Sequence, residues 1–192
     1  MARKDSYLET SGAKPSSRLP SKPVRETSDS ADVSKPHRRR SGAGRPFAGL
    51  YLVATPIGNA QDLSQRAIAV LSAADVVACE DSRVSGRLFA MHNIDAKLTT
   101  YHDHNAHQRR PQLIKRMKDG ESVALVSDAG TPAIADPGYK LARAAIEAGI
   151  PLHALPGASA ALAGLVLSGL PTDGFFFAGF SPPRETARRR RF

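Results

Sequence analysis

The chain has 192 residues, a formal net charge of +9 and 41% hydrophobic residues, which is enough apolar material for a buried core. Its single cysteine, Cys79, excludes a disulfide framework and a cysteine-based zinc site, and indicates a reducing, cytoplasmic compartment. Tryptophan is absent, and no apolar run reaches the roughly 18 to 20 residues of a membrane span.

The positive charge is concentrated at the two ends of the chain. Residues 1–46 carry 11 Lys and Arg against 5 Asp and Glu, and residues 184–192 carry 5 Arg against 1 Glu. The residues between them carry 11 basic and 12 acidic side chains, so the body is nearly neutral. Basic ends attract polyanions such as RNA, but solvated tails without a partner account for the charge equally well.

Residues 1–46 are predicted to form a disordered basic tail. They are rich in Ser, Pro, Lys and Arg and show no helical or alternating apolar period. The absence of an apolar core segment excludes a secretory signal, and the acidic residues argue against an organelle transit peptide.

From residue 47 onward, short apolar runs alternate with amphipathic stretches. The runs predict strands at 50–54, 75–79, 98–100, 123–126, 151–154 and 175–178. Helices are predicted from an N-cap at Asp62 to residue 73, from about 84 to 91, and at 108–118, 139–148 and 158–167. This alternation predicts an α/β fold with a mainly parallel sheet. We expect an N-terminal α/β domain over residues 47–150 and the start of a second α/β domain over 151–192.

Loops rich in polar residues, glycine or proline follow five of the predicted strands. They cover residues 55–59, 80–83, 101–105, 127–132 and 155–157. One such loop alone is ordinarily a turn. Because the carboxyl ends of parallel strands meet at one edge of a sheet, where open α/β folds bind ligands, five of them predict a cleft.

Several side chains of these loops are suited to a site. Asp81 and Asp128 directly follow strands, where a carboxylate either accepts hydrogen bonds from a ligand or caps the next helix. His102 and His104 lie two positions apart, but no further ligand stands at a fixed spacing, so we predict no metal site. They are better suited to lining the cleft or contacting phosphate and ribose. Cys79 is expected in the core.

Six strings, in this order and spacing, resemble one enzyme family. The chain is similar over about residues 49–191 to the rRNA-modifying branch of the tetrapyrrole-methylase-like (class III) S-adenosylmethionine methyltransferases. The strings are LYLVATPIGN (50–59), EDSR (80–83), YHDHN (101–105), ALVSDAGTPAIADPGY (124–139), LPGASA (155–160) and SGLPTD (168–173).

The resemblance implies a two-domain fold, a homodimer and a second domain that continues beyond residue 192. It implies transfer of a methyl group from S-adenosylmethionine to the ribose 2′-hydroxyl of a cytidine in 16S rRNA, at the decoding centre of the small ribosomal subunit. The positions that match the family's cofactor loops are Thr55, Pro56, Gly58, Asn59, Asp128, Gly130, Thr131, Pro132, Ile134, Pro156, Gly157, Ser159 and Ala160, with Thr172 as a weaker candidate.

Methyl transfer to a hydroxyl is helped by removal of its proton. The candidate catalytic groups are Asp81, His102 and His104; the residues do not choose among them, and a role distributed over several groups is equally open. Arg83 and Asn105 are the candidates for binding the substrate.

Two other functions remain open. One is a catalytically impaired fragment that still binds RNA through its basic ends. The other is a small-molecule methylase of the same superfamily that acts on tetrapyrroles. The arginine-rich ends and the SDAGTP string (127–132) favour RNA over a tetrapyrrole.

Overall fold

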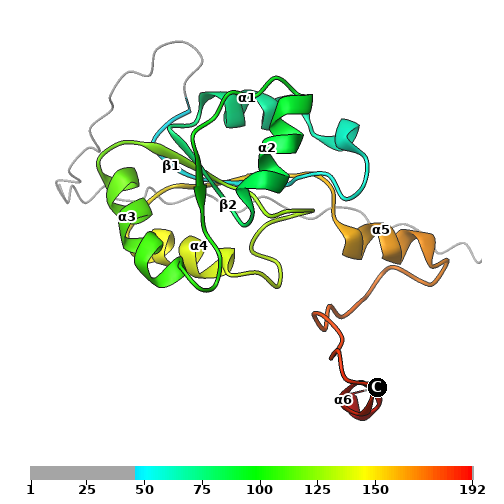
Figure 1. The fold of residues 1–192 in the computed structure, drawn as a ribbon. Helices are drawn as coiled ribbons and strands as arrows, with labels where there is room; N and C mark the ends of the chain where they lie inside the picture. Colours follow the sequence, from blue (N-terminus) through cyan, green and yellow to red (C-terminus); the bar gives the residue numbers. More distant parts are fainter. Residues whose placement is uncertain (1–45, 192) are drawn as a thin grey trace, which may run out of the picture. The chain divides into compact units, whose positions relative to one another are not determined.

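The computed structural model describes residues 46–191, so the expected tail falls almost entirely outside the described residues. Strands and helices alternate along the chain, as the sequence predicts (Figure 1). The elements are β1 (Gly49–Val53), the 3-10 turn η1 (Ala60–Asp62), α1 (Gln65–Ala73), β2 (Val76–Cys79), α2 (Ser82–Met91), β3 (Leu98–Thr100), α3 (Ala106–Lys118), β4 (Ser122–Leu125), α4 (Gly138–Glu147), β5 (Leu152–Leu155), α5 (Ala160–Leu167) and α6 (Glu185–Arg191).

Five parallel strands form one sheet in the order β3-β2-β4-β1-β5. The α/β fold with a parallel sheet is thereby confirmed. In β1, which lies between β4 and β5, Tyr51 lies opposite Ala124 of β4 and His153 of β5. Since β5 is a member of this sheet, a domain boundary after residue 150 would divide the sheet.

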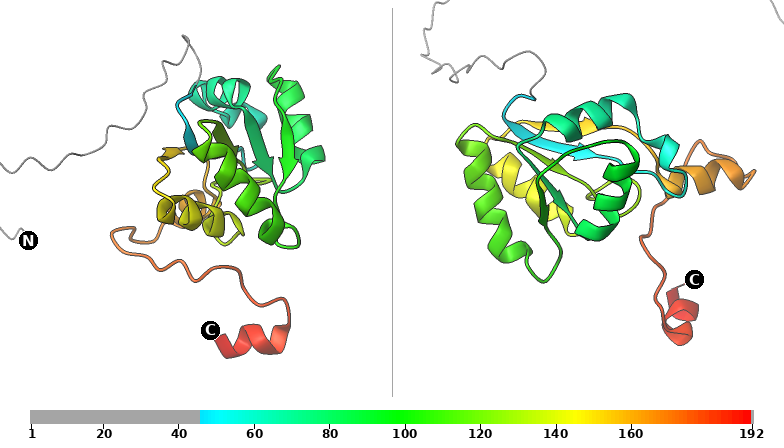
Figure 2. Two further views of the ribbon diagram at one scale, coloured as in Figure 1. Left: turned by 90° about the vertical axis from the view of Figure 1, so that its left-hand side faces the viewer. Right: turned by 45° about the horizontal axis from the view of Figure 1, so that its top comes forward.

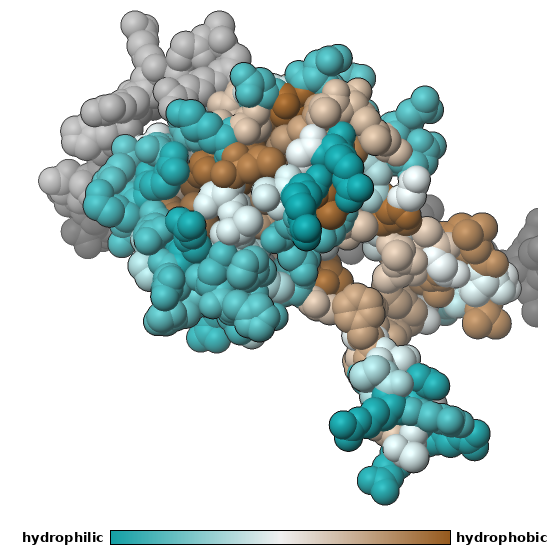
Figure 3. All heavy atoms as spheres, in the orientation of Figure 1, coloured by the Kyte–Doolittle hydropathy of each residue, from teal (hydrophilic) through white to brown (hydrophobic). Residues whose placement is uncertain are grey.

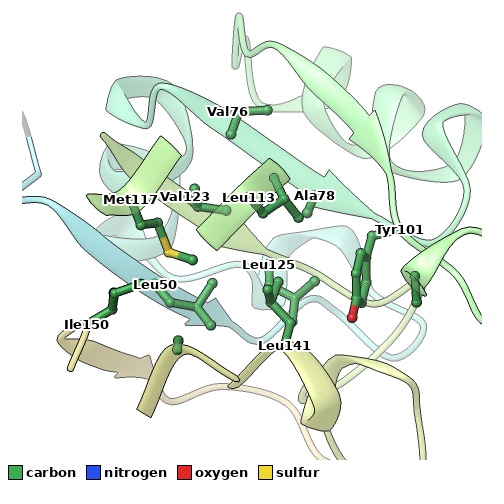
Figure 4. Close-up of a cluster of buried hydrophobic side chains, with 12 residues drawn as sticks. Leu50, Val76, Ala78, Tyr101, Leu113, Met117, Val123, Leu125, Leu141 and Ile150 are labelled. Carbon is green, nitrogen blue, oxygen red and sulfur yellow. The ribbon is translucent and has the colours of Figure 1, made fainter. Parts of the chain in front are cut away.

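Helices cover both faces of the sheet (Figure 2), and alternate residues of the strands pack on opposite faces. Leu50 faces α3 and α4 and packs with Leu113 and Leu141 (Figure 4). Tyr51 faces the other way, toward α1 and α2, and packs with Leu71. Strands that are covered on both faces are continuous apolar runs rather than alternating ones, which explains why these segments were recognisable in the sequence. Cys79 is fully buried in β2, as expected.

The first helix starts later than predicted. Asp62 was expected as its N-cap but lies in η1, and Ser64 caps α1 instead, its hydroxyl accepting a hydrogen bond of 3.1 Å from the amide of Ala67. The reason is the short η1 turn, which Asn59 caps through its side chain. This turn uses residues 60–62 before the backbone reaches the extended conformation that an N-cap needs.

The strand predicted at Phe175–Ala178 is wrong. These residues have no regular secondary structure, and the side chain of Phe176 is 89% exposed. A strand requires a neighbour for its backbone N–H and C=O groups, and no described segment pairs with this one. Aromatic residues therefore indicated a strand that the described residues cannot complete.

Neighbouring strands lead to helices on opposite faces. The chain leaves β2 toward α2 on one face, and leaves the adjacent β4 toward α4 on the other (Figure 1). The connections therefore diverge at the carboxyl ends of these strands. This is the kind of position where open α/β sheets bind their ligands.

Candidate functional site

The loops after β1 and β4 are joined by a short backbone bridge. The amide of Thr55 donates to the carbonyl of Gly130 (2.9 Å), and the amide of Gly130 donates back to Thr55 (3.0 Å). The Thr55 hydroxyl donates to the carbonyl of Ser127 at 3.1 Å, and the residue is only 2% exposed. Thr55 therefore holds two strand-end loops in place, and its hydroxyl is not directed to solvent.

The loop after β5 packs against these two loops. The hydroxyl of Thr131 donates to the carbonyl of Ala158 at 3.2 Å. A Cβ atom added to Gly157 would lie 2.9 Å from the Cβ of Ala54, which is closer than two carbons approach, so only glycine fits there. The predicted convergence of the loops after β1, β4 and β5 is therefore present in the structure.

The loop after β2 joins the same edge through Asp128. One oxygen of this carboxylate accepts a hydrogen bond of 3.1 Å from the backbone amide of Asp81. No described residue donates to the other oxygen, which leaves it available to a ligand. Asp128 thus connects the ends of β2 and β4, in addition to any ligand it binds.

Asp81 is the N-cap of α2, which was one of its two predicted roles. Its carboxylate accepts from the amide of Arg83 at 2.8 Å and forms an ion pair of 2.6 Å with the Arg83 guanidinium. Hydrogen bonds from Arg83 hold the pKa of Asp81 at about 2. A carboxylate that remains ionised at so low a pH is a weak proton acceptor at neutral pH. The same ion pair uses Nε and Nη2 of the Arg83 guanidinium, which was expected to contact substrate and whose side chain is otherwise exposed.

Asn105 shapes the turn that carries the histidines. Its side-chain oxygen accepts from the amide of His102 at 2.9 Å, and its side-chain nitrogen donates to the carbonyl of Thr100 at 3.1 Å. The ring Nδ1 of His102 is buried and has no hydrogen-bond partner among the described residues. The His104 ring meets it edge-on at 5.9 Å between centroids. Asn105 therefore orients His102 from within the turn.

A small hollow of about 10 Å³ lies at the same edge. It contains two carboxylates that were not singled out in the sequence, although both stand in strings that carry the family resemblance. Burial raises the pKa of Glu80, and the negative charges of Asp128 and Asp136 add to this effect. Burial likewise raises the pKa of Asp136. The hollow is lined by Glu80, Tyr101, Leu125, Val126, Ser127, Asp136, Pro137 and Gly138.

The loop after β4 contains two residues in an unusual backbone conformation. Ala133 and Ala135 have φ values of 68° and 55°, in the left-handed region that non-glycine residues rarely occupy. Asp136 stabilises this conformation, because its carboxylate accepts from the amides of Ala133 and Gly138, each at 2.6 Å. Ile134, between the two strained alanines, is 53% exposed at the site edge. Strain of this kind clusters at ligand-binding loops.

The remaining candidates differ in how they relate to this edge. Pro56, Gly58 and Asn59 continue the loop that Thr55 anchors, and Asn59 is occupied as the cap of η1. Pro132, in the loop after β4, is buried. Ser159 is the N-cap of α5 but forms no side-chain cap hydrogen bond. Pro156 and Ala160, which flank that loop, are exposed.

Thr172 is exposed, and no hydrogen bond among the described residues joins it to the strand-end loops. Its assignment to the cofactor site stays a prediction.

The described part of the chain provides no metal centre. None of its His, Cys, Asp and Glu residues form a group of three or more that could hold a metal ion. Nor is any helix within residues 46–191 both long and apolar enough to cross a membrane.

Comparison with known proteins gives one consistent family. A profile described as Tetrapyrrole (Corrin/Porphyrin) Methylases matches residues 49–191. Ribosomal RNA small subunit methyltransferase I of Mesorhizobium japonicum is 54% identical over 142 residues, which are 74% of this chain and 48% of that protein. The protein of the same name from Escherichia coli O157:H7 is 49% identical over 152 residues, 79% of this chain and 53% of that protein. The chain thus spans about half the length of these relatives.

Among solved structures, uroporphyrin-III-C-methyltransferase from Thermus thermophilus is similar with a TM-score of 0.50 and 28% sequence identity. The match covers 65% of this chain and 53% of that one.

Proposed function

This chain belongs to the tetrapyrrole (corrin/porphyrin) methylase family, and from that premise we propose that it methylates ribosomal RNA of the small subunit with S-adenosylmethionine as the methyl donor. The observation that carries the proposal is the name shared by relatives that are 45–54% identical to it, all called ribosomal RNA small subunit methyltransferase I. Within that substrate we propose the 2′-hydroxyl of a cytidine ribose in 16S rRNA, at the decoding centre.

The strand-end edge fits S-adenosylmethionine by the chemistry of its groups. The cofactor carries an ammonium group and ribose hydroxyls, and the unpartnered oxygen of Asp128 is an acceptor for such donors. Backbone groups approach a ligand most closely at glycine, and Gly58, Gly130 and Gly157 stand in the three loops that Thr55 and Thr131 connect. We propose that these loops hold the cofactor.

When bound, the cofactor supplies an activated methyl group for an in-line displacement. The chain's own residues align the acceptor hydroxyl and receive its proton. Among the three candidate groups we favour the two histidines, His102 and His104, whose rings lie together in the loop after β3. Asp81 is disfavoured by its ion pair with Arg83 and its pKa of about 2. Its proposed part is to cap α2 and position Arg83 beside substrate phosphate.

Two alternatives remain as second candidates. The likeness to uroporphyrin-III-C-methyltransferase favours a tetrapyrrole substrate. That protein is 28% identical to this chain, whereas the rRNA methyltransferase relative is 54% identical, so the tetrapyrrole substrate ranks second. An impaired protein that binds RNA without turnover is the other, because α6 ends in four consecutive arginines.

We also propose that the chain is a cytoplasmic homodimer. Apolar side chains of α5 are exposed, Leu167 to 85%, which suits a surface that a second chain covers. The mass in solution, measured by light scattering, tests the dimer.

The decisive experiment compares methyl acceptors for the full chain with radiolabelled S-adenosylmethionine. Unmodified small ribosomal subunits and uroporphyrinogen are supplied side by side, and the product is mapped by nuclease digestion. Transfer to the ribose of a cytidine supports the proposal, whereas transfer to uroporphyrinogen replaces it. Binding of S-adenosylmethionine without transfer to either acceptor supports the impaired protein.

A matched pair of variants tests the site. Asp128→Asn should weaken S-adenosylmethionine binding in calorimetry by about tenfold, because a charge-assisted acceptor is lost. Asp119→Asn, an exposed carboxylate beyond the other end of α3, makes a comparable change away from the strand ends and should leave binding unchanged. Equal affinities for both variants would remove Asp128 from the site.

A further inference from the structure

A groove between α3 and α4 lies outside the residues assigned to cofactor or proton transfer. It has a volume of about 280 Å³ and is lined by Arg110, Tyr139, Lys140, Arg143, Ala144 and Glu147. Both helices start at the carboxyl edge of the sheet, because α3 follows β3 and α4 follows β4. The groove runs along α4 from Tyr139 in its first turn to Glu147 at its end, and Arg110 near the start of α3 borders it.

The charge of this surface is predominantly positive. The α3 segment holds five Lys and Arg residues and no carboxylate. No carboxylate of the described residues forms an ion pair with Arg110. Two acidic side chains reduce the positive charge of the groove. Glu147 pairs with Arg143 at 2.8 Å, and Asp103 lies 3.8 Å from Lys140. Figure 3 shows hydrophilic side chains gathered over α3 and α4.

Arg110 links the groove to the strand-end hollow. Its Nε donates to the hydroxyl of Tyr101 at 3.4 Å, and Tyr101 is a buried residue that lines the hollow beside Glu80. This contact orients the guanidinium, and no hydrogen bond within residues 46–191 uses its terminal nitrogens. Guanidinium groups held in this way bind phosphate oxygens well, because two N–H donors match two oxygens.

The groove also offers an aromatic ring. Tyr139, in the first turn of α4, is 52% exposed, and the ammonium of Lys140 lies 5.8 Å from its ring centroid. An exposed aromatic ring among cations is the arrangement by which proteins bind single-stranded nucleic acid: the cations follow the phosphates and the ring stacks on a base.

We propose that the α3–α4 groove binds the sugar-phosphate backbone of single-stranded RNA next to the reactive nucleotide. This inference rests on the proposed function for the identity of the polymer. Arg110 and Lys140 contact phosphates, and Tyr139 stacks on a base. The RNA then continues past Tyr101 to the strand-end edge.

The test measures binding of a short fluorescein-labelled single-stranded RNA to the full chain by anisotropy, between about 50 and 200 mM salt. The double variant R110Q/K140Q should reduce the slope of log affinity against log salt by about 1.4, because each lost phosphate contact on single strands contributes about 0.7. The matched control R87Q/K118Q removes the same two charges from exposed positions on α2 and on the far end of α3. It should leave the slope unchanged.

Two further variants separate charge from stacking and from folding. R110K/K140R keeps both charges and should retain the wild-type slope, which shows that any loss in R110Q/K140Q is not a folding defect. Tyr139→Leu should weaken binding by about tenfold at every salt concentration without changing the slope, because stacking releases no counterions. Equal slopes for R110Q/K140Q and R87Q/K118Q would show that the α3–α4 groove does not bind RNA phosphates. Wild-type affinity of Tyr139→Leu would show that Tyr139 does not stack on a base.

Methyl transfer, measured on the same samples, separates this inference from the proposed function. If the chain methylates small subunits and R110Q/K140Q has the same salt slope as its control, the proposed function holds and the groove is not the RNA-binding surface. A slope difference with transfer to uroporphyrinogen alone leaves an RNA-binding surface on a protein of different activity. A wild-type chain that binds no RNA at low salt overturns both.

Discussion

The sheet with its four helices and the segment after residue 156 differ in what their apolar residues contact. In α1 and α4, Leu71 and Leu141 are fully buried against the sheet. Helix α5 is more apolar than either, yet no residue of it is buried and Leu167 is 85% exposed. A helix that is apolar on all sides is typical of one that other elements cover. The comparison teaches that apolar composition stabilises a helix only where a partner surface is available.

The largest effect is expected from a core leucine. Leu141→Ala should reduce the free energy of unfolding by about 2–5 kcal/mol, because the side chain is fully buried and leaves a cavity beside Leu125. Leu167→Ala, the same change in α5, should stay within about 0.5 kcal/mol of wild type at protein concentrations where the chain is monomeric, and should cost more where the proposed dimer covers α5. Urea unfolding of both variants measures the difference. A similar loss for Leu167→Ala would mean that α5 is packed against something in solution.

A glycine pair tests the close approach of the site loops. Gly157→Ala should destabilise the chain by about 1–3 kcal/mol and weaken S-adenosylmethionine binding, because the new Cβ would press on Ala54 and separate the loops. Gly164→Ala in α5, where a Cβ meets nothing within 4 Å, should instead be stabilising by about 0.4–1 kcal/mol. Thermal unfolding and calorimetry check both. Unchanged cofactor affinity in Gly157→Ala would separate loop packing from cofactor binding.

A threonine pair makes the same comparison for hydrogen bonds. Thr55→Val should cost about 1 kcal/mol, because the half-buried carbonyl of Ser127 loses its donor. Thr172→Val is exposed and should change stability by less than about 0.5 kcal/mol. The urea midpoints of the two variants measure these two changes in stability. A cost for Thr172→Val as large as that for Thr55→Val would show that Thr172 has a partner in solution.

The smallest effect concerns acid stability. The pKa of Asp81 is lowered to about 2 by Arg83, so its contribution is fully present above the unfolded carboxyl pKa of about 3.9 and is lost as pH falls through about 2. Asp81→Asn should therefore flatten the loss of stability between these values, by a small amount because the pair is at the surface. Urea midpoints across this range measure it. An unchanged acid profile in the variant would show that the pair does not persist in solution.

The elements of the sheet could be predicted because each is encoded locally. Buried parallel strands are short apolar runs, and the helices between them carry a periodic apolar face. The errors occurred where a distant partner decides. Asp62 lost the cap of α1 to Ser64 because η1 intervenes, and Phe175–Ala178 is not a strand because no described segment pairs with it.

The candidate site was predictable in its location more than in the roles of its residues. The loops converge as expected, since strand ends of a parallel sheet must meet. Asp81 caps a helix and is held by Arg83, and Asn105 stabilises a turn, so both are already occupied. Glu80 and Asp136 were overlooked because a raised pKa comes from burial and from neighbouring charges. Neither cause is visible in a linear string of residues.

The sequence by itself determined the α/β class, the family and the edge of the sheet where the candidate cofactor loops meet. Those follow from short-range apolar patterns and from strings of residues that are contiguous in the chain. Only the tertiary structure decided that Thr55 joins two loops, that Asp128 bridges β2 and β4, and that Arg110 reaches Tyr101. Each of these contacts joins separate elements of the fold, and the partners of a hydrogen bond or ion pair are set by packing rather than by local spacing.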